Sequence, residues 1–360
     1  MTLFSSTRSR AGAFAVSVLA AASLLGATSS LASADTGSVF TQTNSAAGNA
    51  VLAFDRAPDG HLIAAGSFAT GGLGSGTSLG SQGPVAVRGD TVYAVDAGSG
   101  DIAALRATRH GLLPSDREPA GAQPISVTVH GSLLYALDAG NGGQILGYRV
   151  RPDGGLKSIN RSARPLGPGA SGPAEVSFSP DGRFLAVTEK DTNHIDTYKV
   201  LPDGRVSGPV INTSAGATPF GFAFDPAGRL IVSEAGASTA SSYTLTSDGA
   251  LAAISAQIPT LQGAACWVAI TPNGRFAYTG NGGGSVTAFA VSARGELTRL
   301  QSFASPGANE VAISPDGSRL YVENPGPGTI SAFSIGTDGL LTALQTVTGL
   351  PTGLAGIAAS

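Results

Sequence analysis

The sequence predicts an all-β protein built as a seven-bladed β-propeller. Three observations lead to this expectation: short runs in which apolar residues alternate with small or polar ones, glycine-centred turns between those runs, and a recurrence of the pattern about every 45 residues. Alternation is typical of half-buried strands, and a glycine between two such runs is typical of a β-hairpin. Two hairpins per repeat make a four-stranded blade, and blades in series make a propeller.

The first 34 residues are typical of a secretory signal peptide. Arg8 and Arg10 precede a run of small apolar residues that ends in the cleavage-site pattern Ala32-Ser33-Ala34. We expect residues 1–34 to be removed and residues 35–360 to form a single propeller domain that is secreted or extracytoplasmic. No later apolar run reaches the roughly 20 residues that a membrane-spanning helix needs, so no membrane span is expected.

Charge and cysteine content narrow the range of partners. Two of the 21 basic residues and none of the 24 acidic ones lie in the leader, which leaves the mature chain with a net charge of −5. This balance argues against nucleic acid or an anionic membrane surface as a partner. The single cysteine, Cys266, allows no internal disulfide. We expect a monomer without a cofactor, whose partner is a small-molecule ligand or a protein of the cell envelope.

Two interleaved series of turn glycines give the number of blades. One series joins the third strand of a blade to the fourth: Gly60, Gly111, Gly154, Gly204, Gly249, Gly295 and Gly339. The other joins the first strand to the second: Gly89, Gly131, Gly182, Gly228, Gly274 and Gly317. The first series has one member more, so one first strand is missing, and the terminal run "LPTGLAGIAAS" (350–360) supplies it. Its partners are "SVFTQTN", "NAVLAF" and "HLIAAGS" near the N-terminus, so strands from both termini share one blade and close the ring.

The innermost strand of each blade lines the central channel, and alternation decides which side chains point into it. The residues expected at the channel mouth are Pro84, Ser126, Glu175, Gly221, Trp267 and Glu310. Glu310 and Glu175 are the candidate catalytic residues, as an acid/base pair; the alternative is two solvated carboxylates at a wet rim. Trp267 is a candidate ligand-binding residue as an aromatic platform, or else a plug of the channel. Ser126 is a further candidate ligand-binding residue in the same ring.

A second ring of polar residues follows the second strands. Its members are Asn or acidic in every repeat: Asn44, Asp96, Asp138, Glu189, Glu234, Asn281 and Asn324. Such regularity is best explained by side-chain oxygens that satisfy backbone N–H groups in the loops. Asn281 and Asn324 nevertheless remain candidate ligand-binding residues. No two histidines have metal-ligand spacing and there is no Cys/His cluster, so no metal site is expected.

One further motif lies in the run "GGLGSGTSLGSQG" (71–83), whose "GTSLG" matches the nucleophile-elbow pattern. That pattern requires a strand-to-helix turn, whereas the composition of this run is typical of a loop. We therefore assign Ser78 no catalytic role.

The phrases "SPDGRFLAV" (179–187), "TPNGRFAYTGN" (271–281) and "SPDGSRLYVEN" (314–324) resemble the repeats of the lactonase family of seven-bladed propellers. That family includes 6-phosphogluconolactonase-type enzymes and fungal carboxymuconate cyclases, and the likeness to its YVTN-type repeat covers residues 37–360. The resemblance implies hydrolysis of a lactone. Active members carry a Pro-His-x-His run before one innermost strand and Arg-His before another. The matching positions here are Gly172 and Ala174, and Cys266 with Trp267, so these histidine and arginine positions are not filled.

The arginines favour a neutral lactone over a phosphorylated one. Arg183, Arg229, Arg275 and Arg319 all follow turns on the face opposite the mouth. Near the mouth we expect only Lys190, Arg164 and Arg117 beside the carboxylates, so a cationic clamp for a phosphate is not expected. The first hypothesis is therefore a secreted hydrolase of a neutral lactone. The alternative is a non-catalytic ligand- or protein-binding propeller of the cell envelope. A calcium- or magnesium-stabilised scaffold that uses the acidic rim is a third.

Overall fold

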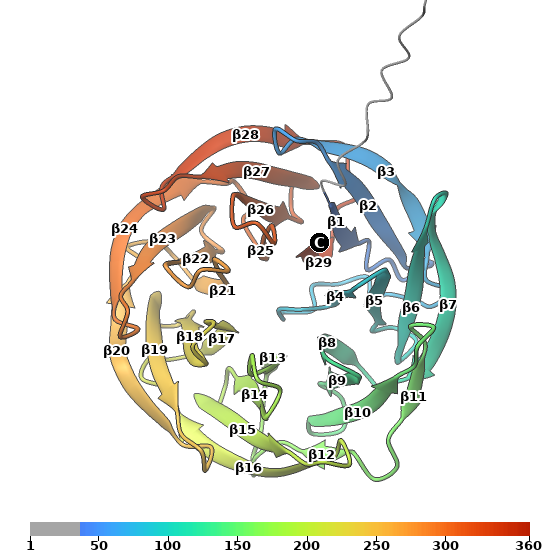
Figure 1. Cartoon of the computed structure of the whole chain (residues 1–360), viewed down its shortest axis with the longest axis horizontal. Coiled ribbons are helices and arrows are strands. Elements are labelled where there is room, and N and C mark those ends of the chain that lie inside the picture. The colour runs from blue at the N-terminus through green and yellow to red at the C-terminus, as the bar shows by residue number, and fades with distance from the viewer. Residues whose placement is uncertain (1–36) are drawn as a thin grey trace, which may run out of the picture. The chain divides into compact units, whose positions relative to one another are not determined.

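The computed structural model describes residues 37–360, and the predicted signal peptide lies outside them. Figure 1 shows these residues as a ring of small sheets around a central axis. Strands β1 to β29 form seven sheets, and no helix occurs between residues 37 and 360. The predicted all-β, seven-bladed propeller is confirmed. None of the described elements is therefore a helix that could cross a membrane.

The first blade is built from both ends of the described chain, as predicted. Its order is β29-β1-β2-β3, with β1 (Ser38–Gln42), β2 (Ala50–Arg56), β3 (Leu62–Ala69) and β29 (Ala355–Ala359). β29 pairs with β1 in antiparallel fashion, which places Phe40 opposite Ala358 and Thr41 opposite Ile357. This pairing covers two sheet edges that would otherwise be exposed, and it closes the ring.

Each of the other six blades is a run of consecutive antiparallel strands. The second blade is β4 (Val85–Arg88), β5 (Thr91–Asp96), β6 (Asp101–Thr108) and β7 (Gly111–Pro119). The third is β8 (Pro124–His130), β9 (Leu133–Asp138), β10 (Gln144–Val150) and β11 (Leu156–Ser158), with β12 (Arg164–Pro165) also on β10. The fourth is β13 (Pro173–Phe178), β14 (Phe184–Glu189), β15 (His194–Val200) and β16 (Val206–Thr213).

The remaining three blades repeat this order. The fifth is β17 (Pro219–Phe224), β18 (Arg229–Glu234), β19 (Thr239–Leu245) and β20 (Leu251–Pro259). The sixth is β21 (Ala265–Ile270), β22 (Phe276–Asn281), β23 (Ser285–Val291) and β24 (Leu297–Ala304). The seventh is β25 (Val311–Ile313), β26 (Arg319–Asn324), β27 (Thr329–Ile335) and β28 (Leu341–Val347).

Buried tyrosines on second strands tie neighbouring blades together. The hydroxyl of Tyr93 donates to the carbonyl of Gly154 in the next blade at 2.8 Å, and that of Tyr278 donates to Gly339 at 2.9 Å. Gly154 has a φ of 83°, and a Cβ there would lie 2.3 Å from Thr91 Oγ1. Glycine is therefore required at this turn for both its backbone conformation and its packing. The glycines that mark the sequence repeat are thus also contact points between blades.

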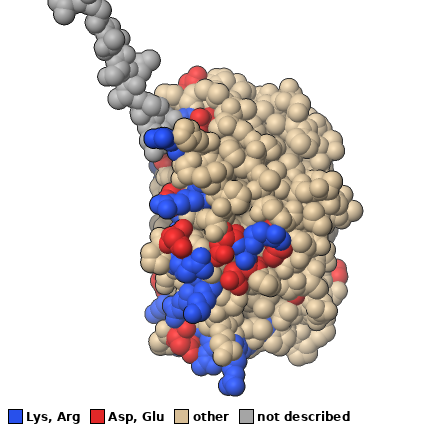
Figure 2. Space-filling model, turned by 90° about the vertical axis from the view of Figure 1, so that its right-hand side faces the viewer, with Lys and Arg blue, Asp and Glu red and all other residues tan. Residues whose placement is uncertain are grey.

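The two faces of the ring differ in their charged groups. We call the face that carries the first-to-second and third-to-fourth strand turns the turn face, and the opposite one the mouth face. Figure 2 shows charged side chains gathered toward one face, while the rest of the visible surface carries few of them. On the turn face, ion pairs form within single turns, such as Arg183 with Asp181 (2.8 Å) and Arg229 with Asp225 (2.6 Å). These turns neutralise their own charge.

Candidate functional site at the channel mouth

The innermost strands share an irregularity where they reach the mouth. The register of pairing shifts between Pro124 and Ser126 in β8, between Pro173 and Glu175 in β13, and between Ala265 and Trp267 in β21. A β-bulge re-aims the side chains that follow it. The bulges therefore set the direction in which these predicted mouth residues point.

The mouth is crossed by Ser78–Pro84, a segment between β3 and β4 that we call the strap. Leu79 of the strap packs against the cores on both sides of the third blade. The Ser81 hydroxyl donates to the carbonyl of Ile125 at 2.8 Å, and the Lys190 ammonium donates to the carbonyl of Gly80 at 2.5 Å. The strap is thus fixed to the third and fourth blades on its way across the ring.

Gln82 of the strap fills the centre of the mouth and is 8% exposed. Its main-chain N–H donates to the carbonyl of Ala174 at 3.0 Å. Its side-chain Oε1 accepts a hydrogen bond from the N–H of Val268 at 2.8 Å. Its Nε2 donates to the carbonyls of Val268 at 3.0 Å and Phe222 at 3.2 Å, and lies 3.4 Å from Glu175 Oε1. One side chain therefore links the fourth, fifth and sixth blades on the channel axis.

Glu175 and Glu310 are both buried, with 5% of each exposed, so neither is a solvated rim carboxylate. Glu175 Oε2 accepts from the N–H of Phe222 at 2.6 Å, and Glu310 Oε1 accepts from the N–H of Gly83 at 2.9 Å. Burial raises the pKa of each carboxyl well above its usual value, although these N–H donors oppose the rise. The negative charge of Glu323 raises the pKa of Glu310 further. A dry setting of this kind suits a carboxyl base, but the strap occupies the space in front of it.

Trp267 is 7% exposed and is packed rather than open to a ligand. Its indole N–H donates to the carbonyl of Ser81 at 2.9 Å, and its ring meets Phe220 edge to face with the ring centres 5.2 Å apart. This is the geometry of a plug. Neighbouring Cys266 is buried in the same apolar cluster, and burial raises the pKa of its thiol to about 12.

The other three candidate ligand-binding residues are also buried and hydrogen-bonded. Ser126 Oγ accepts from the N–H of Val176 at 3.2 Å. The Asn281 amide donates to the hydroxyls of Ser285 and Thr287, and the Asn324 amide donates to those of Thr329 and Ser331. The structure brings Glu175, Glu310 and Trp267 together around the strap. Asn281 instead bonds within its own blade, and Asn324 also accepts from the Ser305 hydroxyl at 2.9 Å, in the segment that joins the sixth blade to the seventh.

A small cavity of about 20 Å³, enough for about one water molecule, remains beside the strap. Glu310 and Glu323 line it together with Trp267. Glu323 is fully buried, its Oε1 accepts from the Thr41 hydroxyl at 2.5 Å, and its Oε2 makes no hydrogen bond. Burial raises the pKa of Glu323 to about 7, against the opposing effect of the Thr41 hydroxyl. Here a candidate catalytic carboxyl borders open volume.

The residues that the sequence analysis missed are Gln82 and Glu323. Gln82 lies in a Gly/Ser-rich run that carries no strand signal, and the elbow-like match at residues 76–80 does not include it, so nothing local marks it as a channel residue. Lys190 is held over the Phe220 ring, with Nζ 5.0 Å from the ring centre, and burial lowers its pKa. Only the folded ring reveals that these side chains meet.

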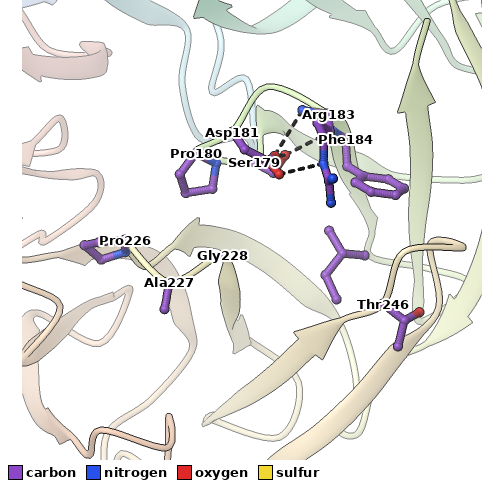
Figure 3. Close-up of a pocket in the computed structure, with 10 residues that line it drawn as sticks. Ser179, Pro180, Asp181, Arg183, Phe184, Pro226, Ala227, Gly228 and Thr246 are labelled. Atoms are coloured by element: carbon purple, nitrogen blue, oxygen red, sulfur yellow. Dashed lines mark hydrogen bonds and ion pairs between the residues drawn. The ribbon is translucent and has the colours of Figure 1, made fainter.

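A second hollow lies on the turn face between the fourth and fifth blades (Figure 3). It has a volume of about 210 Å³ and lies between the turns 179–184 and 226–228. Its charged groups, Asp181 and Arg183, pair with each other, as the dashed lines in Figure 3 show. The hollow therefore presents no unpaired charge, and it is not the candidate site.

The described residues contain no group of three or more His, Cys, Asp or Glu side chains arranged to hold a metal ion. At the mouth, the acidic groups are instead bonded to main-chain N–H groups and hydroxyls.

Comparisons with known proteins agree with this architecture. A family model described as "Lactonase, 7-bladed beta-propeller" matches residues 161–266 and 237–353. A comparison with curated proteins found no match.

Solved structures of similar fold include a periplasmic gluconolactonase of Pseudomonas aeruginosa, 20% identical, which covers 88% of this chain and 98% of its own with a TM-score of 0.67. A Bacteroides fragilis protein provisionally described as a 6-phosphogluconolactonase is 18% identical and covers 91% of this chain and 99% of its own, with a TM-score of 0.70. A Lactobacillus plantarum protein is 20% identical and covers 90% and 99%, with a TM-score of 0.72. At these identities the likeness concerns the fold.

The repeat phrases, the seven closed blades and the family model, which spans more than half of the sequence, lead to one conclusion: the chain belongs to the lactonase family of seven-bladed β-propellers.

Proposed function

We propose that this chain is an exported, non-catalytic member of the lactonase family that binds its ligand at the propeller mouth. The observation that carries the proposal is the strap. Ser81, Gln82 and Gly83 take up the hydrogen-bonding groups of Trp267, Glu175 and Glu310. Because these groups of Trp267, Glu175 and Glu310 are already paired, the mouth favours binding by exchange of hydrogen-bond partners over chemistry on a bound water.

The chemistry of hydrolysis supports the same choice. Lactone opening needs a water held beside a base and a donor for the developing oxyanion. Both oxygens of Glu175 meet protein donors, Phe222 N–H and Gln82 Nε2. Lys190, the cation nearest the strap, donates to Gly80. The positions where active relatives carry histidine hold Gly172 and Ala174, and Ala174 is fully buried.

Hydrolysis of a neutral lactone is the second candidate, favoured by family membership and by the cavity that Glu310 borders. The Pseudomonas aeruginosa neighbour is described as a periplasmic gluconolactonase, which points to sugar lactones and to an extracytoplasmic location. In this case Glu310 would activate water in that cavity, with its pKa raised by burial. This second candidate does not extend to phosphorylated lactones.

A lactone panel on the purified mature protein separates the two candidates. It should include neutral sugar lactones, phosphorylated sugar lactones and muconolactone-like rings. We expect no turnover above that of a Glu310→Gln, Glu175→Gln double variant. Turnover of a neutral lactone that falls at least about tenfold in Glu310→Gln would establish the hydrolase instead. Turnover that survives both substitutions would remove these residues from the site.

Export can be tested separately. N-terminal sequencing of material from the culture medium or periplasm should find a chain that begins near Asp35. Material that retains Met1 would exclude signal-peptide cleavage at this position.

A further inference from the structure

The protein groups that surround the Gln82 side chain, which we call the wall, have a defined hydrogen-bonding pattern. The wall offers one donor, the N–H of Val268, and two main-chain acceptors, the carbonyls of Val268 and Phe222, and Glu175 Oε1 lies 3.4 Å from Nε2. Since Oε1 meets an N–H and Nε2 meets two main-chain carbonyls, the orientation of the amide is fixed by its partners. The wall therefore forms hydrogen bonds with both the oxygen and the nitrogen of one carboxamide.

Few other groups would satisfy this pattern. A primary carboxamide supplies two N–H donors and a carbonyl acceptor from a single planar group. A carboxylate has no donor and would face the two main-chain carbonyls, while an ammonium has no acceptor for the Val268 N–H. A hydroxyl has a single donor and would leave an acceptor unpaired, which is costly in a buried site. The wall is therefore selective for a primary carboxamide.

The pattern belongs to the propeller rather than to the strap. Val268 and Phe222 lie on the innermost strands β21 and β17, whose channel-side N–H and C=O groups have no neighbouring strand in their own sheets. Such edge groups need partners when buried. Gln82 exchanges an N–H···O and an O···H–N bond with Val268, as a residue of an adjacent strand would. The wall is set by the bulged strands and exists whichever amide occupies it.

We propose that the mouth is a binding site for a primary carboxamide. The side chain of Gln82, from the same chain, occupies this site when the strap is in place, and a ligand that carries a carboxamide occupies it when the strap moves away. The inference rests on the proposed binding function, to which it adds the chemical class of the ligand. The segment leading into the strap and the strap itself have glycines at positive φ, Gly76 (71°), Gly80 (57°) and Gly83 (78°), which lets the chain turn sharply on both sides of Gln82.

The test removes the tethered amide and supplies a free one. Gln82→Ala should lower Tm, because the wall loses its partners and a cavity the size of the amide remains. Acetamide or propionamide should restore most of the lost Tm by binding the native state. Acetate and N,N-dimethylacetamide, of similar size, should not. Gln42→Ala is the matched control: Gln42 is a fully buried glutamine of β1 that accepts from the Asn49 amide, and its loss should not be rescued by amides.

Equal rescue by acetate or dimethylacetamide, equal rescue of Gln42→Ala, or no rescue by any amide would overturn the proposal. If Gln82→Ala does not fold, a comparison of Gln82→Glu with Gln82→Met tests the proposal instead. The glutamate variant should melt well below the methionine variant at pH 8 and recover toward it at pH 5, when the added carboxyl gains a proton. Equal melting of the two at pH 8 would exclude an acceptor-rich wall. The lactone panel reports on catalysis and this test on wall chemistry, so either can fail without the other.

Discussion

The indole N–H of Trp267 donates a hydrogen bond of 2.9 Å to the main-chain carbonyl of Ser81, 186 residues earlier in the chain. Trp267 belongs to the sixth blade, whereas Ser81 precedes the second. Together with the Gln82 and Gly83 bonds to the fourth to seventh blades, this bond seals the channel from the mouth face. Trp267 and the strap together close the channel at the mouth face.

Replacement of Trp267 should therefore mainly lower the stability of the fold. Trp267→Ala should lower the free energy of unfolding by about 3–5 kcal/mol, because a large buried side chain is lost. Trp267→Phe should cost less, since it keeps contact with Phe220 and loses chiefly the Ser81 hydrogen bond, worth about 1 kcal/mol. Denaturant melts of the three proteins measure both differences. An alanine variant as stable as the parent would show that the indole is a surface platform after all.

The fold could be predicted almost completely from the sequence, whereas the site could not. Gly154 and Gly339 recur because each repeat has the same tight turn, so the repeat period and the number of blades can be read from the sequence alone. The closing strand could be found by counting turns. Gln82 could not be found this way, because its role depends on main-chain atoms of Phe222 and Val268 that lie 140 and 186 residues away. The burial of Glu175 and Glu310 was missed for the same reason, since the strap covers them.

Closure of the ring by the two termini leads to a truncation test. Deletion of residues 355–360 removes β29, which exposes the edge of β1 and the inner face of the first blade. Ile357, buried in the core between the seventh and first blades, is lost as well. We expect aggregation or loss of a cooperative melt, measured by calorimetry and light scattering. An unchanged Tm in the truncated protein would contradict closure by β29.

The tyrosine contacts between blades can be tested one at a time. Tyr278→Phe should lower the free energy of unfolding by about 1–2 kcal/mol, because it deletes the bond to Gly339 and leaves that carbonyl without its donor. Tyr93→Phe should cost a similar amount, since it deletes the equivalent bond to Gly154. The two sites share no partner, so their effects should add in the double variant. Stability unchanged in both single variants would show that the rings alone hold the blades together.

The buried carboxyl of Asp196 makes the stability of the fold depend on pH. Burial, together with the neighbouring Glu189, raises the pKa of Asp196 to about 7 against the opposing N–H of Gly167. In the unfolded chain the same group titrates near 3.8. Between these values the native state keeps a proton that the unfolded state has lost. The free energy of unfolding must therefore fall as the pH rises from about 4 to about 7, and then level off.

Asp196→Asn should remove this part of the slope, because the amide is uncharged at every pH while its oxygen can still accept from Gly167. Asp316 supplies the contrast. Although burial opposes it, hydrogen bonds from the Ser314 hydroxyl and the Ser318 N–H lower the pKa of Asp316 to about 2. Its contribution to stability is present above about pH 4 and is lost as the pH falls toward 2. Asp316→Asn should therefore leave the slope between pH 4 and 7 intact and flatten the curve below it. Urea melts of the parent and both variants from pH 3 to 8 measure these slopes, and a parent whose stability rises from pH 4 to 7 would show that buried acids such as Asp196 are ionised in the native state.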